Sequence, residues 1–290
     1  MTITNDMMLR ATKAIFYKIT CIVFAIGYQI DENLFNIARI FPNLKILDMS
    51  NAVITCHSLK NKLNNMKKLE EVKFPSECPL LWELDGTFQG CECLQKVDLG
   101  HMPNLVSMNH TFVDCKSLKT VLATGVFESL AEMRGTFCDC ARYSPDTLPF
   151  IAPNLEVINC AFMGTAVTSF EFKPMIVDGE RAEYRFISMA FAFADCGLLE
   201  RLVFNDLDVS LLSCEGIENL VRGAINFKII KINGEDSWGP NVNECLMTNV
   251  SAIPTGMALP KAPSKYLVSF LWILRGHPLR EGKRPELWFN

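Results

Sequence analysis

Apolar side chains recur in one pattern along the middle of this chain. The clearest copy has seven apolar positions: Leu81, Leu84, Phe88, Cys91, Leu94, Val97 and Leu99. In successive copies the central slot is filled by Leu63, Phe88, Phe112, Phe137, Phe162 and Phe193, which are 25, 24, 25, 25 and 31 residues apart. A fixed period of this length predicts one supersecondary unit per repeat, and stacked units form a solenoid with a continuous core. We therefore expect the five phenylalanines to form a buried column.

The two halves of each repeat differ in the spacing of their apolar residues. The segments 69–74, 94–99, 118–122 and 199–204 end in alternating apolar and polar residues, which predicts short strands with one buried face. The segment 105–112 instead places apolar residues three and four positions apart, which predicts a turn of helix or an irregular turn. The expected fold is an α/β repeat solenoid with a parallel β-sheet on one face, short helical or irregular turns on the other, and caps at both ends.

Two segments interrupt the repeats. Pro145 and Pro149 fall where a strand is expected, so this repeat should bulge outward. The segment 173–185 is charged, contains Pro174 and Gly179, and lengthens its repeat, which predicts a surface loop. We divide the chain into an N-terminal cap at 1–35, the solenoid at 36–232 and an irregular C-terminal cap at 233–290.

Composition sets limits on partners and location. The 290 residues carry a net charge of −4 and no basic tract, so nothing in the sequence favours nucleic acid as a partner. The apolar run 19–27 follows Arg10, Lys13 and Lys18, and it fits either a weak signal peptide or an amphipathic cap over the first repeat. Neither this run nor the apolar run 266–274 is long enough to span a bilayer.

Twelve cysteines raise the question of disulfides or a metal site. Four of them occupy the same slot of successive repeats: Cys91, Cys115, Cys140 and Cys196. A column of buried, reduced thiols explains this placement more simply than cross-links do, because disulfide frameworks are typical of shorter secreted chains. The pairs Cys91-Glu-Cys93 and Cys138-Asp-Cys140 are spaced one residue closer than in a zinc knuckle, and the repeat already explains one cysteine of each.

The repeat resembles one found in a known family. The spacing Met-x-x-x-Phe-x-x-Cys-x-x-Leu-x-x-Val at 108–121 is similar to the BspA-like leucine-rich repeat of bacterial surface proteins and lipoproteins. The segment 161–170 is similar to a variant in which Gly164-Thr165 replaces the cysteine turn. The resemblance covers about residues 40–232. It implies a right-handed leucine-rich-repeat solenoid and a role as an adhesin or host-interaction protein at the cell surface or secreted; a cytoplasmic location is the alternative.

Motifs for catalysis or cofactor binding are missing from the sequence. It contains no glycine-rich phosphate loop, no His-Glu-x-x-His helix and no Gly-x-Ser-x-Gly elbow. The four histidines His57, His101, His110 and His277 are scattered, and nothing places one of them beside a cysteine nucleophile. We therefore expect a protein that is not an enzyme and has no cofactor or metal.

The sheet face is the best candidate for a binding surface. If Leu47, Val72, Val97, Val121 and Leu202 point inward, alternation turns their neighbours outward. The candidate partner-binding residues are then Glu71, Lys73, Lys96, Asp98, Thr120, Leu122, Arg201 and Val203. We expect a macromolecule-binding repeat protein whose partner is a protein of unknown identity. The alternatives are a structural repeat protein without a tight ligand and an intracellular effector-type scaffold.

Overall fold

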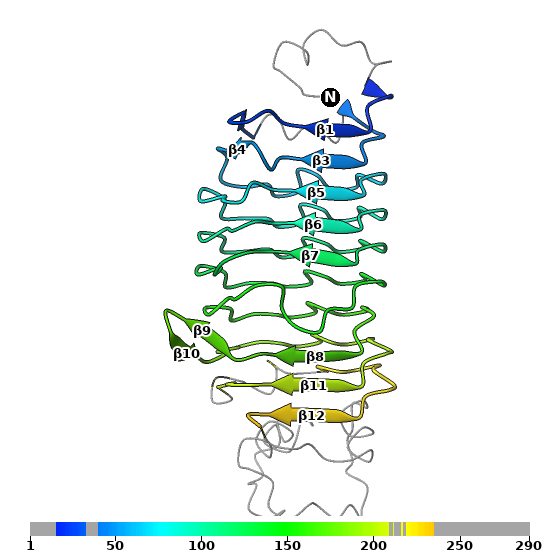
Figure 1. Cartoon of the computed structure of the whole chain (residues 1–290). Helices are drawn as coiled ribbons and strands as arrows, with labels where there is room; N and C mark the ends of the chain where they lie inside the picture. Colours follow the sequence, from blue (N-terminus) through cyan, green and yellow to red (C-terminus); the bar gives the residue numbers. More distant parts are fainter. Residues whose placement is uncertain (1–15, 33–39, 209–210, 212–215, 217–218, 235–290) are drawn as a thin grey trace, which may run out of the picture.

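The computed structural model describes residues 16–32, 40–208, 211, 216 and 219–234. This part of the chain winds into a parallel β-solenoid of about eight turns, which we call coils (Figure 1). Coils 3 to 8 span residues 66–90, 91–114, 115–139, 140–164, 165–195 and 196–223, and each of them ends at a residue with positive φ. The predicted stacking of repeats is confirmed.

One wall of the solenoid consists of parallel strands. A five-stranded sheet contains, in spatial order, β1 (Cys21–Val23), β3 (Ile46–Asp48), β5 (Glu71–Lys73), β6 (Lys96–Asp98) and β7 (Thr120–Leu122). Further along the same wall, β8 (Ser169–Phe172), β11 (Arg201–Phe204) and β12 (Ile229–Ile232) form a three-stranded sheet (Figure 1). The residues predicted to point inward are all buried: Leu47, Val72, Val97, Val121 and Leu202.

Shorter contacts join the coils on the other sides. β2 (Gln29–Ile30) pairs with β4 (Val53–Ile54), and single-residue bridges follow at the corresponding place in later coils. A second column of bridges runs through Ser58, Glu83, Ser107, Glu132, Val157 and Ser188. Because each regular coil is hydrogen-bonded to its neighbours on several sides, its buried backbone groups have partners without any helix.

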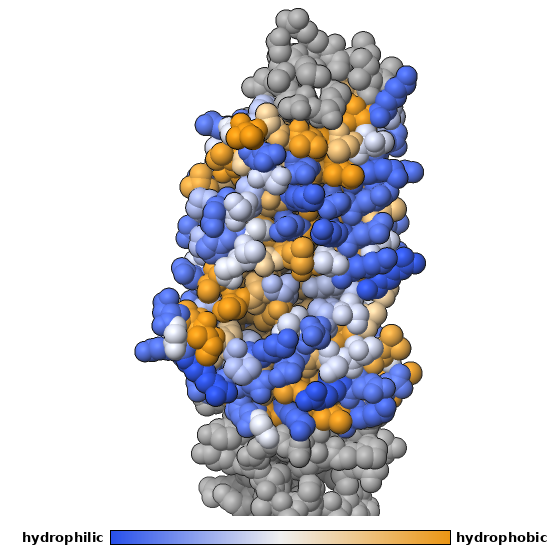
Figure 2. Space-filling view, in the orientation of Figure 1, coloured by the Kyte–Doolittle hydropathy of each residue, from blue (hydrophilic) through white to orange (hydrophobic). Residues whose placement is uncertain are grey.

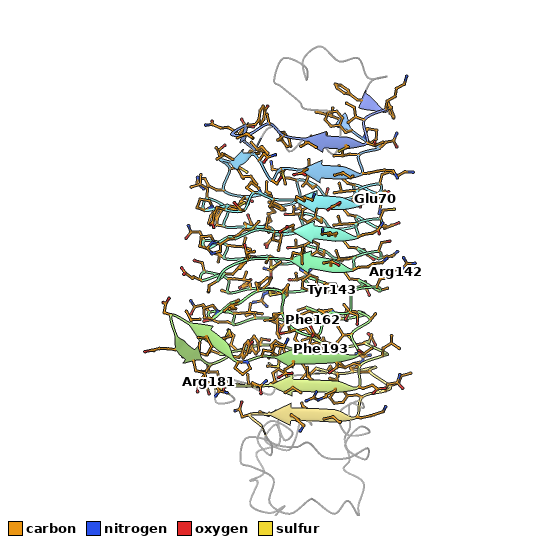
Figure 3. All side chains as sticks on the ribbon, viewed as in Figure 1. Glu70, Arg142, Tyr143, Phe162, Arg181 and Phe193 are labelled. Atoms are coloured by element: carbon orange, nitrogen blue, oxygen red, sulfur yellow. The ribbon has the colours of Figure 1, made fainter. Side chains whose placement is uncertain are left out.

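The core is one continuous apolar cluster. Its centre is the predicted column, in which the rings of Phe88, Phe112, Phe137, Phe162 and Phe193 stack in that order with centroids 5.1–5.5 Å apart. All five side chains are fully buried, and Phe162 and Phe193 lie one beyond the other inside the stack (Figure 3). These separations are typical of offset-stacked rings. The predicted phenylalanine column is confirmed.

Polar groups beside this column bond back to the main chain. Each slot cysteine points its thiol at a main-chain carbonyl 27–34 residues earlier in the chain, at 3.0–3.2 Å: Cys91 at Leu63, Cys115 at Phe88, Cys140 at Phe112 and Cys196 at Phe162. A buried threonine repeats as Thr87, Thr111 and Thr136. The Thr111 hydroxyl donates to the Met108 carbonyl at 2.7 Å and lies 2.9 Å from the Leu84 carbonyl. Because each slot thiol points at a carbonyl oxygen, the cysteine slot needs a side chain that is small and can donate a hydrogen bond.

Sharp corners use residues with positive φ. In one corner slot these are Asn61, Gly86, His110, Gly135, Cys160 and Phe191. The side chain of one coil lies over the glycine of the next, so that a Cβ added at Gly135 would sit 2.6 Å from His110 Nδ1. Glycine and asparagine adopt this backbone conformation at the lowest cost, whereas Cys160 and Phe191 hold it under strain.

Of the two expected kinds of turn, helical and irregular, the structure has the irregular one. The elements of the described part of the chain are all strands, and 105–112 consists of a bridge followed by turns. Its amides bond across to the next coil, as in Met108 N–H to Glu132 at 3.0 Å and Phe112 N–H to Thr136 at 2.8 Å. The three-and-four spacing thus reflects a corner and not a helix. The α/β expectation is corrected to a β-solenoid with essentially no helix. Among the described residues we find no helix of the length and apolarity that a membrane crossing requires.

Coil 6 lacks a strand in this wall, as its prolines predict. Tyr143 fills the leucine slot, Pro145 takes the first strand position, and Asp146 stands where other coils have an inward valine. The Asp146 side chain is 84% exposed, so the chain turns outward at this point. The sheet therefore ends at β7, and β8 belongs to a second sheet.

The insertion at 173–185 is a surface segment, as predicted, but it is more ordered than a loop. It forms an antiparallel hairpin of β9 (Met175–Val177) and β10 (Glu180–Ala182), which projects from one side of the solenoid (Figure 1). Two contacts tie it down: Tyr184 Oη donates to the Lys173 carbonyl at 2.7 Å, and Arg181 pairs with Asp206 at 2.6 Å.

The structure describes only part of the two predicted caps. β1 and β2 lie within the segment expected to be the N-terminal cap, and β1 pairs in register with β3 as part of the first coil. Residues 1–15, 33–35 and 235–290, which make up the rest of the two predicted caps apart from a short described stretch, lie outside the described residues.

Candidate partner-binding surface

Six of the eight predicted binding residues lie together on the five-stranded sheet. They flank the inward valines of β5, β6 and β7. Because the strands pair in register, these residues form two rows across the sheet, Glu71–Lys96–Thr120 and Lys73–Asp98–Leu122. The predicted alternation of inward and outward side chains therefore holds for this part of the surface.

Three of the four charged residues in these rows take part in ion pairs, whereas Asp98 accepts a hydrogen bond from the Gly100 backbone N–H at 3.2 Å. Lys73 Nζ lies 3.6 Å from Asp48 and 3.8 Å from Glu71, and Lys96 Nζ lies 3.6 Å from Glu71. Burial acts to raise the pKa of Asp48, but hydrogen bonds from Ser50 and the nearby Lys73 outweigh it and hold the pKa below its usual value. Such half-exposed pairs contribute at most about 1 kcal/mol each. Their main effect here is to neutralise charge within the sheet face.

The β7 end of this face is apolar. Leu122 is 44% exposed, although it lies beside the charged rows and in register with Asp98. β7 is the last strand of its sheet, because coil 6 bulges outward where the next strand would pair. Figure 2 shows apolar surface in this middle part of the molecule, bordered by hydrophilic residues. Leu122 thus combines exposure, apolar character and a fixed backbone.

The remaining two predicted residues lie elsewhere. Arg201 and Val203 belong to β11 in the three-stranded sheet, so the eight residues do not form one continuous surface. The expectation that Val203 is exposed is wrong, since only 4% of it is accessible. Val203 lies on the middle strand, in register with Glu171 and Lys231 on either side. The longer neighbouring side chains shield the short valine between them.

A second wall carries a hydrogen-bonded polar ladder that was not among the predicted sites. Asp85 accepts bonds from the Ser107 hydroxyl and, at 2.8 Å, from the Asn109 backbone N–H. The Asn109 side chain in turn donates to Glu132 at 2.9 Å and accepts from the Arg134 backbone N–H at 2.7 Å. The signal was present as polar residues on both sides of the inward residues Leu84, Met108 and Met133. The ladder was not predicted because the segment was expected to form a helical or irregular turn and not a bridge between coils.

An exposed apolar corner borders this ladder. Leu80, Trp82 and Val106 are 43%, 54% and 42% exposed, and the Val106 N–H donates to the Trp82 carbonyl at 2.8 Å. Trp82 and Val106 each come directly before a residue of the bridge column, and none of the three residues belongs to the predicted binding face of the sheet. Their exposure could not be read from the repeat, because the apolar template gives only the buried slots.

The cysteines have the environment of structural thiols. All ten in the described part of the chain are free, and the four slot cysteines are buried, which confirms the predicted placement of these thiols in the core. Burial raises the pKa of Cys91, Cys115 and Cys196, so their thiolate is scarce at neutral pH. In the pair Cys91-Glu-Cys93, Cys91 is buried whereas Cys93 is exposed, so the two thiols have different environments. Among the described residues, no group of three or more side chains is suited to holding a metal ion.

Comparisons with protein-family models, with curated proteins and with solved structures gave no match to this chain. The fold assignment therefore rests on the strand pairing and the stacked core.

Proposed function

We propose that this chain is a non-enzymatic repeat protein that binds another protein through the outer face of its five-stranded sheet, around Leu122. The observation that carries the proposal is a leucine that is 44% exposed on a paired strand, at the edge of a sheet face where Asp48, Glu71, Lys73 and Lys96 form ion pairs with one another. An apolar centre with a polar surround is the usual anatomy of a protein interface. A surface that is ordered before binding also loses less conformational entropy when a partner arrives.

The non-enzymatic part of the proposal rests on how the reactive residues are used. The repeat assigns the slot cysteines and the buried threonines to packing and to hydrogen bonds with main-chain carbonyls. The solenoid itself offers an extended surface for a macromolecular partner, as stacked repeats commonly do.

We further propose that the repeats are a divergent form of the BspA-like leucine-rich repeat, acting as an adhesin or host-interaction protein at the cell surface or after secretion. The support is the shared order of Phe, Cys, Leu and Val slots, each of which fills the same place in successive coils. An intracellular effector-type scaffold is the alternative, and it agrees with the free thiols.

A structural repeat protein without a tight ligand is the second candidate. It is favoured by the pairing of Asp48, Glu71, Lys73 and Lys96 among themselves, since residues already satisfied gain little from a partner. The two candidates differ in what substitution of Leu122 should do.

The experiment compares two exposed apolar residues on different walls. Leu122→Asp should abolish capture of a partner from extracellular-matrix or host extract, while Val106→Asp, which is almost equally exposed, should leave capture unchanged. Both variants should keep the thermal stability of the wild type. Normal capture by Leu122→Asp would move the binding surface to another wall, and labelling of intact cells would test the surface location separately.

A further inference from the structure

His101 lies where the bridges between coils are interrupted. On its wall, parallel bridges join Glu77 to His101 and Val126 to Ile151, but in this described stretch none joins His101 to Val126. The His101 side chain fills that gap. Its Nε2 lies 2.9 Å from the Val126 carbonyl oxygen in coil 5, and its Nδ1 lies 2.9 Å from Glu77 Oε2 in coil 3. One imidazole ring therefore connects three consecutive coils.

The chain leaves a fitted space for this ring. Gly125 has a φ of +75°, and a Cβ added there would lie 2.7 Å from Cδ2 of His101. On another side the ring meets the edge of the buried Phe127, with centroids 6.4 Å apart. The side chain is only 25% exposed. The ring is thus held in one orientation between the two acceptors.

The two partners favour one protonation state. A carboxylate and a carbonyl oxygen can only accept hydrogen bonds, whereas a neutral imidazole has one N–H and one bare nitrogen. In either neutral tautomer, one of the two contacts sets a nitrogen lone pair against an oxygen lone pair. Only the imidazolium donates to both partners.

The charges around the ring agree with a cation. Glu77 faces it from coil 3 and forms its only ion pair among the described residues with His101. Coil 5 faces the ring with Gly125, Val126 and Phe127, none of which is charged; Glu128, the next residue in the chain, is an acid. On its own coil the neighbours are Gly100 and Met102.

We propose that His101 is a proton-dependent clamp, which ties coils 3, 4 and 5 together while both ring nitrogens carry protons. It releases coil 5 when Nε2 loses its proton, because the charged Glu77 carboxylate is the stronger acceptor and retains the Nδ1 proton. The sign follows from the contacts: the clamp is complete at acidic pH and is lost as the pH rises through the range where the ring deprotonates. The segment it releases is 123–127, directly after β7. This inference does not depend on the proposed binding function.

Nitrogen-15 NMR of the histidine rings tests the protonation state. His57 has one acceptor, the Leu80 carbonyl at 3.1 Å, which a neutral ring satisfies, so it serves as an internal control. Along a pH titration, the amides of 124–127 should lose hydrogen-exchange protection in step with the change of the His101 ring from two protonated nitrogens to one. A loss of protection that does not follow the change at His101, or that follows the change at His57 instead, would overturn the proposal.

A Glu77→Gln variant tests the clamp itself. The glutamine amide can donate to a bare ring nitrogen, so a neutral His101 would satisfy both partners. In the wild type, hydrogen-exchange protection of 124–127, corrected for intrinsic rates, should fall about tenfold between pH 6 and 8, the effect of losing one charge-assisted hydrogen bond. In Glu77→Gln it should stay nearly constant.

The matched control is Glu92→Gln, which removes an exposed carboxylate paired with Lys67 and should leave the pH dependence intact. His101→Gln should show low protection at both pH values. Protection that does not change with pH in the wild type, or that falls equally in Glu77→Gln, would contradict the clamp.

Discussion

Coils 3 to 5 and coils 6 to 7 are built on the same slots, but only the first group fills them regularly. In coil 6, Tyr143 replaces a leucine and Asp146 an inward valine; in coil 7, Thr165 replaces a cysteine and Phe191 occupies a corner with positive φ. The strand wall is interrupted at coil 6, yet the phenylalanine column passes through both groups without interruption. The column and the bridges are therefore sufficient to carry the stack across a missing strand.

In coils 6 and 7, aromatic contacts take the place of the regular slot contacts that these coils lack. Tyr143 lies 4.5 Å from Phe137, and Phe170 of β8 lies 4.8 Å from Phe162, both measured between ring centroids. Thr165 also substitutes for the missing thiol as a small polar group, 3.3 Å from the thiol of Cys196. The irregular coils thus keep a buried apolar core while their outer shape changes.

The largest expected effect on stability comes from the phenylalanine column, which runs through both groups of coils. Phe112→Ala should lower the free energy of unfolding by about 3–5 kcal/mol, because it removes a ring stacked on both sides and leaves a cavity. Urea denaturation measures the loss. A decrease below about 1 kcal/mol would mean that the column does not carry the core.

A smaller effect is expected at a regular corner. Gly135→Ala should cost about 1–3 kcal/mol, since the backbone has positive φ and the new methyl group would meet the His110 ring. Gly197→Ala is the matched control, because a Cβ there meets nothing within 4 Å. Equal melting temperatures for the two variants would contradict the proposed corner geometry.

The same corner slot in coil 6 should respond in the opposite direction. Cys160 holds a positive φ of 55° and is only half-buried, so Cys160→Gly should relieve strain and stabilise the protein by about 0.5 kcal/mol. Thermal denaturation of Cys160→Gly, compared with the wild type and with Gly135→Ala, shows whether stability rises or falls. Destabilisation by more than 1 kcal/mol would show that the thiol packs better than its exposure indicates.

Thiol reactivity should separate buried slots from exposed positions without changing stability. Cys91, Cys115, Cys140 and Cys196 should react slowly with an alkylating reagent under native conditions, and the exposed Cys93 should react fast. Mass spectrometry of peptides at increasing times measures both classes in one sample. Rapid labelling of the four slot cysteines would place them outside the core.

The sequence predicted the stack, the phenylalanine and cysteine columns and the inward valines, because each repeats with the period of the coil. It did not predict the corners. Spacings of three and four suit a helix as well as a turn with positive φ, and Asn61 or His110 in such a corner leaves no apolar signature. The burial of Val203 was missed because strand alternation places a side chain on a face but says nothing of its neighbours in register.

Register is the central claim, since every predicted column and surface depends on it. In a Cys93→Ser background, Lys96→Cys with Thr120→Cys places two thiols on residues that are direct partners in β6 and β7. Lys96→Cys with Leu122→Cys places them diagonally, about 8 Å apart between Cα atoms, which is beyond the reach of a disulfide. Mild oxidation followed by mass spectrometry should show a disulfide in the first pair and free thiols in the second. A disulfide in the diagonal pair and none in the direct pair would contradict the solenoid register.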